Sequence, residues 1–377
     1  MRRFLEYIIV CVMVIISSSC NIDEEITTSL PPKISIEGNG SYRVRLGDEL
    51  HLAPRYENSD EATYSWSIEG VELSNEPTYT FTAQSKGLTK ILLTVSNTSG
   101  SDSRTFSITT IDRFMVYDYT PAPGQFIGEL KTGGFVGTET TYEDAIAYAE
   151  SRLMDEKFVS LGAFGGYIIV GFDRIVENRD GYDFSIGNNA FDGSSEPGVV
   201  WVMQDENGDG EPNDTWYELS GSETGKAETI QNYTITYYRP EASKMDVAWS
   251  DNMGGSGVVK YLEDFHNQDF YYPAWIDADS YTLRGTLLKS RSYDSSGNGS
   301  KWVNPAFDWG YADNASTVDN LNRENHFEIS NAIDEQGNAV KLEYIDFIKV
   351  QSAIQQQCGW IGEVSTEVTS FKIIDSE

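Results

Sequence analysis

Histidine and cysteine are scarce in this chain of 377 residues, which has three of each. The histidines at positions 51, 266 and 326 are far apart in the sequence, which disfavours a zinc site built on neighbouring histidines. Cys11 and Cys20 fall within the first twenty residues, so the body of the chain has no disulfide framework.

The sequence also lacks the short motifs of common catalytic sites. It has no HExxH pair, no G-x-S-x-G nucleophile elbow and no P-loop. Cys358 would need a nearby histidine and an activating environment to act as a nucleophile, so we interpret it as a small buried residue. The 59 acidic residues permit a carboxylate pair that hydrolyses glycosides, but no spacing selects one. We expect a binding protein rather than an enzyme, with a hydrolase as an alternative.

Basic residues are outnumbered, with 27 Lys and Arg against 59 Asp and Glu and a net charge of −32. Such a surface repels nucleic acid phosphates. It favours divalent cations and keeps an exposed protein soluble. Because 39% of the residues are hydrophobic, the chain can still form a core.

Long apolar runs are absent, and the one short run, Ile8–Ile16, follows Arg2 and Arg3. A helix that spans a bilayer needs roughly 18 or more apolar residues. Residues 1–19 are therefore predicted to be a signal peptide that is removed by cleavage.

The residues after this run carry a second signal. The segment Ser17–Cys20 resembles a bacterial lipoprotein cleavage site, which implies that Cys20 is lipidated. The acidic residues 23–25 resemble the signal that sends Bacteroidetes lipoproteins to the outer face of the outer membrane. An ordinary signal peptide with a coincidental cysteine is the alternative. A lipid-anchored surface protein meets neither ATP nor reduced nicotinamide, so nucleotide-driven chemistry is not expected.

Residues 20–32 are predicted to form a lipidated tether, and residues 33–111 alternate with period two between turn-forming residues. This spacing predicts a β-sandwich of about 80 residues. The aromatic segment Tyr64–Trp66 and the segment 92–101 resemble the buried strand and closing hairpin of the PKD type of immunoglobulin-like domain. Such domains mostly act as spacers in bacterial surface proteins, so no site is expected here.

Residues 112–377 contain seven of the eight tryptophans. Apolar residues at helical spacing, with acidic residues in the first turn, predict a helix over 141–154. Long loops separate the predicted strands and are typical of a binding face. The clearest strands are predicted at 164–172, 198–203, 233–238 and 344–350. We expect an all-β chain: an immunoglobulin-like sandwich, then a larger jelly-roll-like β-sandwich with one or two helices.

The segment 205–214, DENGDGEPND, has the spacing of a calcium-binding loop. Side-chain oxygens stand at positions one, three and five, and Gly210 permits the turn at position six. Trp216 takes position twelve, where an EF-hand has a bidentate Glu, so we expect an EF-hand-like loop between two strands. A solvated acidic turn is the alternative. The predicted ligands of a structural calcium ion are Asp205, Asn207, Asp209, Glu211 through its main-chain carbonyl, and Asp214.

Two further segments, 270–275 and 302–311, are rich in aromatic residues and are predicted to be long loops. Trp and Tyr supply rigid amphipathic contact area, and sugar rings and flat macrocycles both bind such surfaces. Packing in the core of a large sandwich is the alternative for each of these residues. The candidate ligand-binding residues are Trp249, Asn252, Tyr271, Tyr272, Trp275, Trp302, Trp309 and Tyr311.

Seven short segments of the larger domain together carry a resemblance to a known family. They are SLGAFGG (160–166), DFSIGNNAF (183–191), SEPGVV (195–200), TWYEL (215–219), DNMGGSG (251–257), AFDWGYADN (306–314) and QCGW (357–360). Together they resemble a family of Bacteroidetes surface lipoproteins with a PKD-like domain. Some members look like the accessory cobalamin-binding lipoproteins of corrinoid transporters.

This resemblance implies capture of cobalamin at the cell surface and its transfer to a TonB-dependent outer-membrane transporter. It does not assign the residues that contact the corrin, so the aromatic candidates above rest on chemistry alone. Specificity for cobalamin would come from buried hydrogen bonds to its amides, since each unpaired partner costs roughly 1–3 kcal/mol. The alternative is a glycan-binding surface lipoprotein of a polysaccharide utilisation system, and a purely structural surface protein is a further one.

Overall fold

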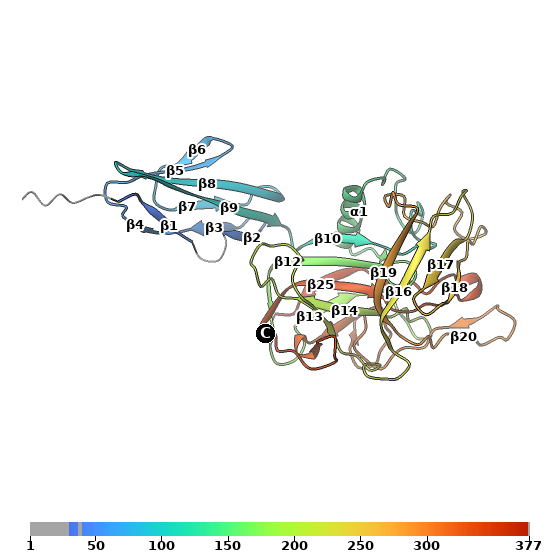
Figure 1. Ribbon diagram of the computed structural model, residues 1–377. Coiled ribbons are helices and arrows are strands. Elements are labelled where there is room, and N and C mark those ends of the chain that lie inside the picture. Colours follow the sequence, from blue (N-terminus) through green and yellow to red (C-terminus); the bar gives the residue numbers. More distant parts are fainter. Residues whose placement is uncertain (1–29, 37–39, 376–377) are drawn as a thin grey trace, which may run out of the picture.

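The computed structural model describes residues 30–36 and 40–375 (Figure 1). The predicted signal peptide, Cys20 and most of the tether lie outside the described residues. None of the helices in these two ranges is both long and apolar enough to cross a membrane. The molecule is elongated, with a small N-terminal β-sandwich at one end and a larger, nearly all-β body at the other.

The N-terminal sandwich has nine strands. They are β1 (Lys33–Ser35), β2 (Ser41–Arg45), β3 (Glu49–Leu52), β4 (Arg55–Glu57), β5 (Thr63–Ile68), β6 (Val71–Ser74), β7 (Tyr79–Thr82), β8 (Gly87–Asn97) and β9 (Gly100–Ile111). Five of them form a sheet in the order β2-β9-β8-β5-β6, and β3 pairs with β7. Trp66 is fully buried against Tyr79 and Phe106. The predicted aromatic strand and closing hairpin are confirmed, the hairpin being β8–β9.

The larger body contains one α-helix, α1 (Tyr142–Met154), and the strands β10 to β27. The first nine of these strands are β10 (Phe114–Thr120), β11 (Val159–Ser160), β12 (Tyr167–Glu177), β13 (Phe184–Gly187), β14 (Gly198–Met203), β15 (Trp216–Leu219), β16 (Ile230–Tyr238), β17 (Val247–Asp251) and β18 (Ser256–Val259). The other nine are β19 (Ser280–Leu287), β20 (Tyr293–Asp294), β21 (Trp302–Val303), β22 (Asn320–Leu321), β23 (Glu324–Phe327), β24 (Ala332–Ile333), β25 (Tyr344–Ser352), β26 (Glu367–Val368) and β27 (Ser370–Ile373). Two short 3-10 helices span Ile329–Asn331 and Gly359–Ile361.

Two sheets enclose the main core of this body. A six-stranded sheet has the order β10-β12-β25-β14-β15-β24, and a four-stranded sheet has the order β22-β23-β13-β27. Because side chains alternate along a strand, Val200 and Ile348 of the first sheet point inward and join one cluster with Phe184 and Phe371 of the second. The all-β sandwich prediction is confirmed.

Helix α1 covers one side of this core. Thr141 caps it, with a capping box to Asp144, and Tyr148 and Leu153 are buried on its inner face. The predicted helix is therefore confirmed. The strand expected at 164–172 is β12, which begins three residues later because Gly165, with φ 87°, turns the chain before Tyr167.

The outer face of the six-stranded sheet bears polar residues in register. Trp201 of β14 pairs with Lys349 of β25 on one side and with Glu218 of β15 on the other. A second four-stranded sheet, β18-β17-β16-β19, lies against this face. Gln351 and the main chain of Arg284 link the two sheets, with Nε2 donating to the carbonyl at 3.0 Å. The predicted division of the chain between residues 111 and 112 is kept as a proposal.

Candidate functional site

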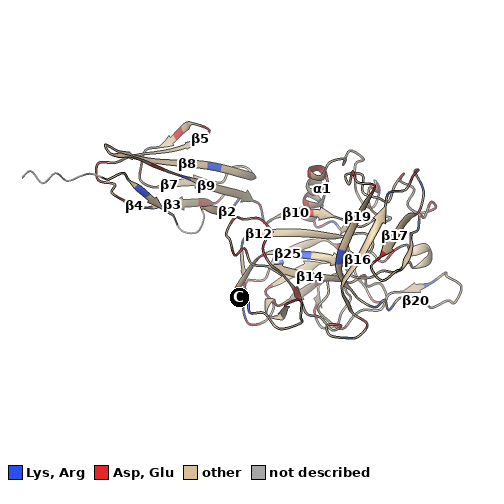
Figure 2. Ribbon diagram, in the orientation of Figure 1, with Lys and Arg blue, Asp and Glu red and all other residues tan. Residues whose placement is uncertain are grey.

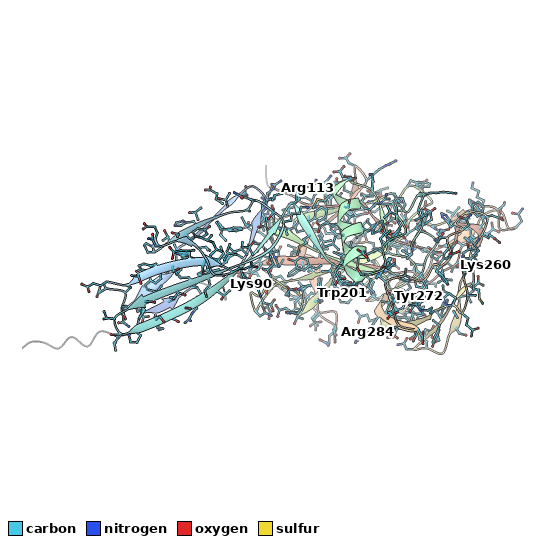
Figure 3. The ribbon with its side chains drawn as sticks, turned by 90° about the horizontal axis from the view of Figure 1, so that it is seen from above. Lys90, Arg113, Trp201, Lys260, Tyr272 and Arg284 are labelled. Carbon is cyan, nitrogen blue, oxygen red and sulfur yellow. The ribbon has the colours of Figure 1, made fainter. Side chains whose placement is uncertain are left out.

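A cavity of about 400 Å³ lies on the outer face of the six-stranded sheet, where β14, β15 and β25 meet the edge of β19. We call it the Trp201 pocket. Its principal lining residues are Trp201, Trp216, Tyr217, Glu218, Arg284 and Lys349, of which Figure 3 labels Trp201 and Arg284. The turn after β24, residues 334–336, completes the rim. The pocket thus combines an aromatic wall with several hydrogen-bonding groups.

Lys349 lines this pocket beside two tryptophan rings. Its ammonium nitrogen lies 4.6 Å from the ring centroid of Trp201 and 5.3 Å from that of Trp216. Burial lowers the pKa of this ammonium to about 8. Within residues 30–36 and 40–375, no carboxylate forms an ion pair with it. Two indole rings therefore hold a cation whose hydrogen-bond donors are available to a ligand.

Glu218 lies on the other side of Trp201 in the same cross-strand row. Its carboxyl accepts a hydrogen bond from the hydroxyl of Thr286 on β19 at 2.5 Å. Burial nevertheless raises its pKa to about 7, so this group changes charge near neutral pH. The indole nitrogen of Trp201 is buried, and the described residues supply it with no hydrogen-bond acceptor. A polar ligand finds donors and acceptors here on both sides of an aromatic ring.

Four of the eight aromatic-loop candidates are core residues. Tyr271, Tyr272, Trp275 and Tyr311 are buried. The hydroxyl of Tyr272 donates to the carbonyl of residue 278 at 2.8 Å, and Trp275 packs 5.8 Å from the ring of residue 119. In this structure their rings face other side chains rather than a cavity.

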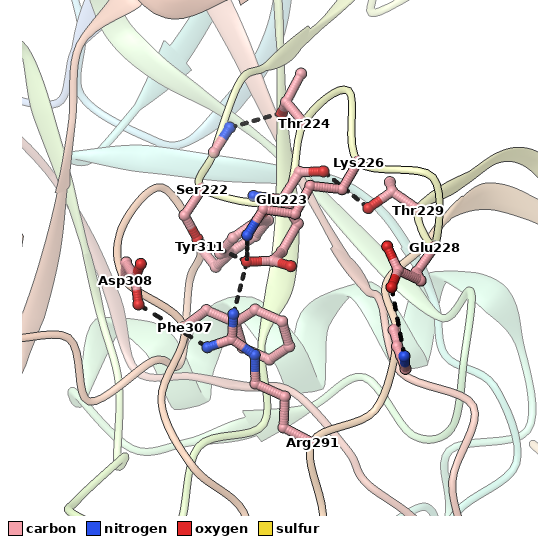
Figure 4. A network of polar contacts seen from close by, with 12 residues as sticks. Ser222, Glu223, Thr224, Lys226, Glu228, Thr229, Arg291, Phe307, Asp308 and Tyr311 are labelled. Atoms are coloured by element: carbon pink, nitrogen blue, oxygen red, sulfur yellow. Dashed lines mark hydrogen bonds and ion pairs between the residues drawn. The ribbon is translucent and has the colours of Figure 1, made fainter.

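Figure 4 shows what holds Tyr311 in place. Its hydroxyl accepts a hydrogen bond from the main-chain N–H of Glu223 at 3.0 Å. The carboxylate of Glu223 forms an ion pair with Arg291 at 2.7 Å, and the guanidinium of Arg291 lies 4.1 Å from the centroid of Phe307. The loop 302–311 is therefore bound to its surroundings by packing and charge, in support of the core alternative.

The other four candidates do not converge on one cavity. Trp249 lines a hollow of about 170 Å³ beside β18, and Trp309 lines one of about 250 Å³ near β23. Trp302 lies against Gly359. Asn252 is exposed and accepts a hydrogen bond from the N–H of Thr234 at 3.1 Å. None of the eight lines the Trp201 pocket, and their contact with a ligand stays a prediction.

Trp201 and Lys349 were not predicted as site residues, and Glu218 was considered only as an alternative to Asp214 among the calcium ligands. A signal for Lys349 exists in the sequence, because a lone lysine interrupts the apolar strand 344–350. A cation in such a strand must face solvent, a partner or a ligand. The sequence does not show that a tryptophan of a strand 150 residues away lies beside it, so the pocket itself could not be predicted.

The segment 205–214 joins two paired strands, β14 and β15, as expected. Its carboxylates turn inward: Asp205 accepts from the N–H of Gly210 at 2.9 Å, and Asp214 accepts from the N–H of Glu206 at 2.9 Å. Asn207 accepts from the N–H of Asp209 at 2.7 Å. This oxygen-rich arrangement fits a hard cation such as calcium.

A larger groove of about 1000 Å³ separates the N-terminal sandwich from the body, and the segment 205–214 forms part of it. Arg43 of β2 crosses the groove, with one guanidinium nitrogen 3.3 Å from the Asp346 carboxylate and another donating to the Gly210 carbonyl at 3.3 Å. Its guanidinium also lies 4.3 Å from the ring centroid of Phe347. The N-terminal sandwich therefore contacts the segment 205–214 directly.

Comparison with known proteins identifies the N-terminal domain. The family model of the PKD-like domain matches residues 31–97, which confirms the predicted PKD-like domain. A search of curated proteins found no match.

Several solved structures show distant likeness. A quinonprotein alcohol dehydrogenase-like protein from Bacteroides thetaiotaomicron is 24% identical over 24% of this chain and 23% of its own length, with a TM-score of 0.20. Carbohydrate-binding modules of the β-sandwich superfamily are 13% identical over 92% of this chain and 99% of theirs, with a TM-score of 0.25. A SusE-like protein is 8% identical over 91% of this chain and 95% of its own length, with a TM-score of 0.16. The chain spans less than a quarter of the first protein, and likenesses at this level carry no argument about function.

Proposed function

We propose that the larger domain binds glycans without catalysis, and that the Trp201 pocket is its binding site. The observation that carries this proposal is the convergence of Trp201, Trp216 and the buried Lys349 ammonium in one cavity. The apolar face of a sugar ring stacks on an indole, while its hydroxyls accept from an ammonium and donate to a carboxylate.

The size of the pocket agrees with a small part of a polymer. Its volume of about 400 Å³ lies toward the lower end of the ~300–1,000 Å³ of small-molecule sites. A short run of sugar rings therefore enters the pocket, while the rest of the chain continues past the rim. The acidic surface, which Figure 2 shows on strands and loops of both domains, favours neutral over acidic glycans.

The cellular setting belongs to the same proposal. Cleavage after residue 19 and lipidation of Cys20 anchor the protein in the outer membrane, facing the cell exterior. The PKD-like domain then holds the binding domain away from the lipid. A TonB-dependent outer-membrane transporter is the expected partner, since captured nutrients must next cross that membrane.

Cobalamin is the second candidate ligand, and the groove beside Arg43 is the observation that favours it. A corrin ring with its amide arms is much larger than a sugar ring, and the groove of about 1000 Å³ is the more suitable cavity. Tyr42, Tyr117 and Tyr344 supply aromatic surface there, and Asp346 supplies an acceptor for amides. Transfer to a TonB-dependent transporter follows in this case as well.

We also propose that the segment 205–214 binds a structural calcium ion. Asp205, Asn207, Asp209 and Asp214 would supply side-chain oxygens, and Glu211 its main-chain carbonyl. The inward-facing carboxylates support this proposal. The ion would brace the loop against the N-terminal sandwich.

Binding assays on the chain from Asn21 onward test the two ligands. The protein is run on affinity gels that contain neutral polysaccharides and is titrated calorimetrically with cyanocobalamin. Glycan binding in the pocket is supported if a polysaccharide retards the wild type and Arg43→Ala but does not retard Trp201→Ala. One-to-one cobalamin binding that Arg43→Ala weakens, with no retardation by any polysaccharide, would replace the first proposal by the second.

A further inference from the structure

Three carboxylates from distant parts of the chain meet inside the larger body. Glu196 precedes β14, Asp313 lies in the loop 306–314, and Glu367 opens β26. One oxygen of each lies within 4.8 Å of the others. The main chain ties two of the three segments together, because the N–H of Glu196 donates to the carbonyl of Asp313 at 3.0 Å.

Two members of this carboxylate triad, Asp313 and Glu367, are buried, and Glu196 is half-buried. Only 1% of Asp313 and 2% of Glu367 is exposed. Among the described residues, no lysine or arginine forms an ion pair with any of the three. Burial raises the pKa of each member, that of Glu367 to about 7, and repulsion from Glu367 adds to the increase at Glu196 and Asp313. Three negative charges in such a place are costly unless protons or a cation neutralise them.

One oxygen of the triad also lacks a hydrogen bond. Oδ2 of Asp313 accepts from the N–H of Glu367 at 2.8 Å. Oδ1 of the same carboxylate is buried, and no donor of the described residues reaches it with normal hydrogen-bond geometry. Most buried acceptors in folded proteins have a donor, so this oxygen is available to coordinate a cation.

We propose that Glu196, Asp313 and Glu367 form a calcium site, separate from the segment 205–214 and from the Trp201 pocket. All the donors are oxygens, and the hydroxyl of Ser365, which donates to Glu367 at 2.9 Å, adds another nearby. Zinc prefers nitrogen and sulfur ligands. Calcium accepts six to eight oxygens in flexible geometry, which three carboxylates can largely provide, while magnesium demands a near-ideal octahedron.

The ion would fasten three segments at the start of β14. Gly198, two residues after Glu196, pairs with Ser352 of β25 and with Ala312 beside Asp313. Trp201 follows on the same strand. The ion would therefore fix the strand that carries the pocket, although the proposal does not depend on which ligand the pocket binds.

Calcium binding to the full mature chain tests this site. After treatment with EDTA, the wild type, Asp205→Asn and Asp313→Asn are compared at pH 7.5 by native mass spectrometry and thermal unfolding with calcium alone. Asp205→Asn disables the loop 205–214, so any remaining calcium binds elsewhere. We expect this variant to bind one ion and to gain roughly 5–10 °C in Tm at a hundredfold excess over Kd.

Asp313→Asn should lose one calcium ion and this gain in Tm. It should still fold, because asparagine has the same shape and removes one buried charge. If Asp313→Asn does not fold, Glu367→Gln is measured instead. Calcium binding to the Asp205→Asn protein tests the site in either case. An Asp205→Asn protein that binds no calcium, or an Asp313→Asn protein that binds as many ions as the wild type, would overturn the site. Equal binding of magnesium would overturn its assignment to calcium.

Discussion

The ammonium nitrogen of Lys349 lies 4.6 Å from the ring centroid of Trp201, its register partner on the neighbouring strand. A desolvated cation–π contact is worth about 2 kcal/mol. Burial lowers the pKa of Lys349 to about 8, because removing the charge from water is costly. The pocket therefore holds a cation whose remaining donors are satisfied best when a ligand is present.

Removal of the Trp201 ring should abolish glycan retention. We expect Trp201→Ala to weaken binding at least about 30-fold, because a central aromatic contact is typically worth 2 kcal/mol or more. Retardation on affinity gels and calorimetric titration measure this loss. Trp360→Ala is the matched control, since Trp360 is 47% exposed and contacts Phe265 instead. Equal losses in both variants would argue against the pocket.

Replacement of Lys349 should separate binding from stability. Lys349→Met keeps the length of the side chain and removes the buried charge, so we expect glycan binding to fall at least tenfold. The free energy of unfolding should rise by roughly 1–3 kcal/mol at pH 7. Chemical denaturation and titration measure the two effects. Lys260→Met, at an exposed position, should change neither. A less stable Lys349→Met protein would contradict this account.

Glu218 should make stability depend on pH. Its folded pKa of about 7 lies above the ordinary value of 4.5, so the folded state binds more protons between these pH values. Stability from this group is complete below pH 4.5 and is lost as pH rises through 7, by about 3 kcal/mol. Glu218→Gln lacks this titration. The free energy of unfolding of the wild type and of Glu218→Gln is measured from pH 5 to 8 at a constant calcium concentration. As the pH rises, the wild type should become less stable relative to the variant.

Calcium removal should destabilise the larger domain through the segment 205–214. EDTA should lower its Tm, and Asp205→Ala or Asp209→Ala should produce part of this loss without EDTA, because calcium would remain at the site of Glu196, Asp313 and Glu367. Differential scanning calorimetry measures these transitions. Asp334→Ala serves as the control, because Asp334 stabilises a different exposed turn by accepting from the N–H of Asn338 at 2.8 Å. An unchanged transition in chelator would count against calcium in both proposed sites.

Tyr311 tests the aromatic-loop hypothesis. Tyr311→Phe removes only the hydroxyl that accepts from the Glu223 N–H, which leaves a buried donor unpaired. We expect a loss of about 1–3 kcal/mol in unfolding free energy and no change in ligand affinity. If affinity falls while Tm stays constant, Tyr311 contacts the ligand, as the sequence analysis predicted.

Local patterns in the sequence predicted much of the fold. The helix over 141–154 and the strand over 198–203 follow from periodicity and capping, which act between residues close in the chain. The PKD-like domain was recognised from the aromatic strand and the hairpin of β8 and β9. The segment 205–214 joins two strands, as its glycines and acidic residues indicated.

The aromatic loops were harder to interpret, because composition does not distinguish an exposed tryptophan from a buried one. Tyr271 and Tyr311 have hydroxyls that find partners inside the protein, so burial costs them little. Trp201, in contrast, looks like one apolar residue of a buried strand, yet it faces the outer side of the sheet. Its environment depends on the strand order, which no local signal specifies.

The sequence by itself determined the class of this protein: an acidic all-β chain with a PKD-like N-terminal domain and an acidic loop between two paired strands. These properties depend on composition and on spacings of a few residues. The tertiary structure alone decided which residues meet, since it brought Lys349 beside Trp201 and joined Glu196, Asp313 and Glu367. Lys349 and Trp201 are 148 residues apart in the chain, and every pair of the three carboxylates is at least 54 residues apart. Long-range strand pairing is fixed by burial of the whole core, so the sites that it creates appear only once the chain has folded.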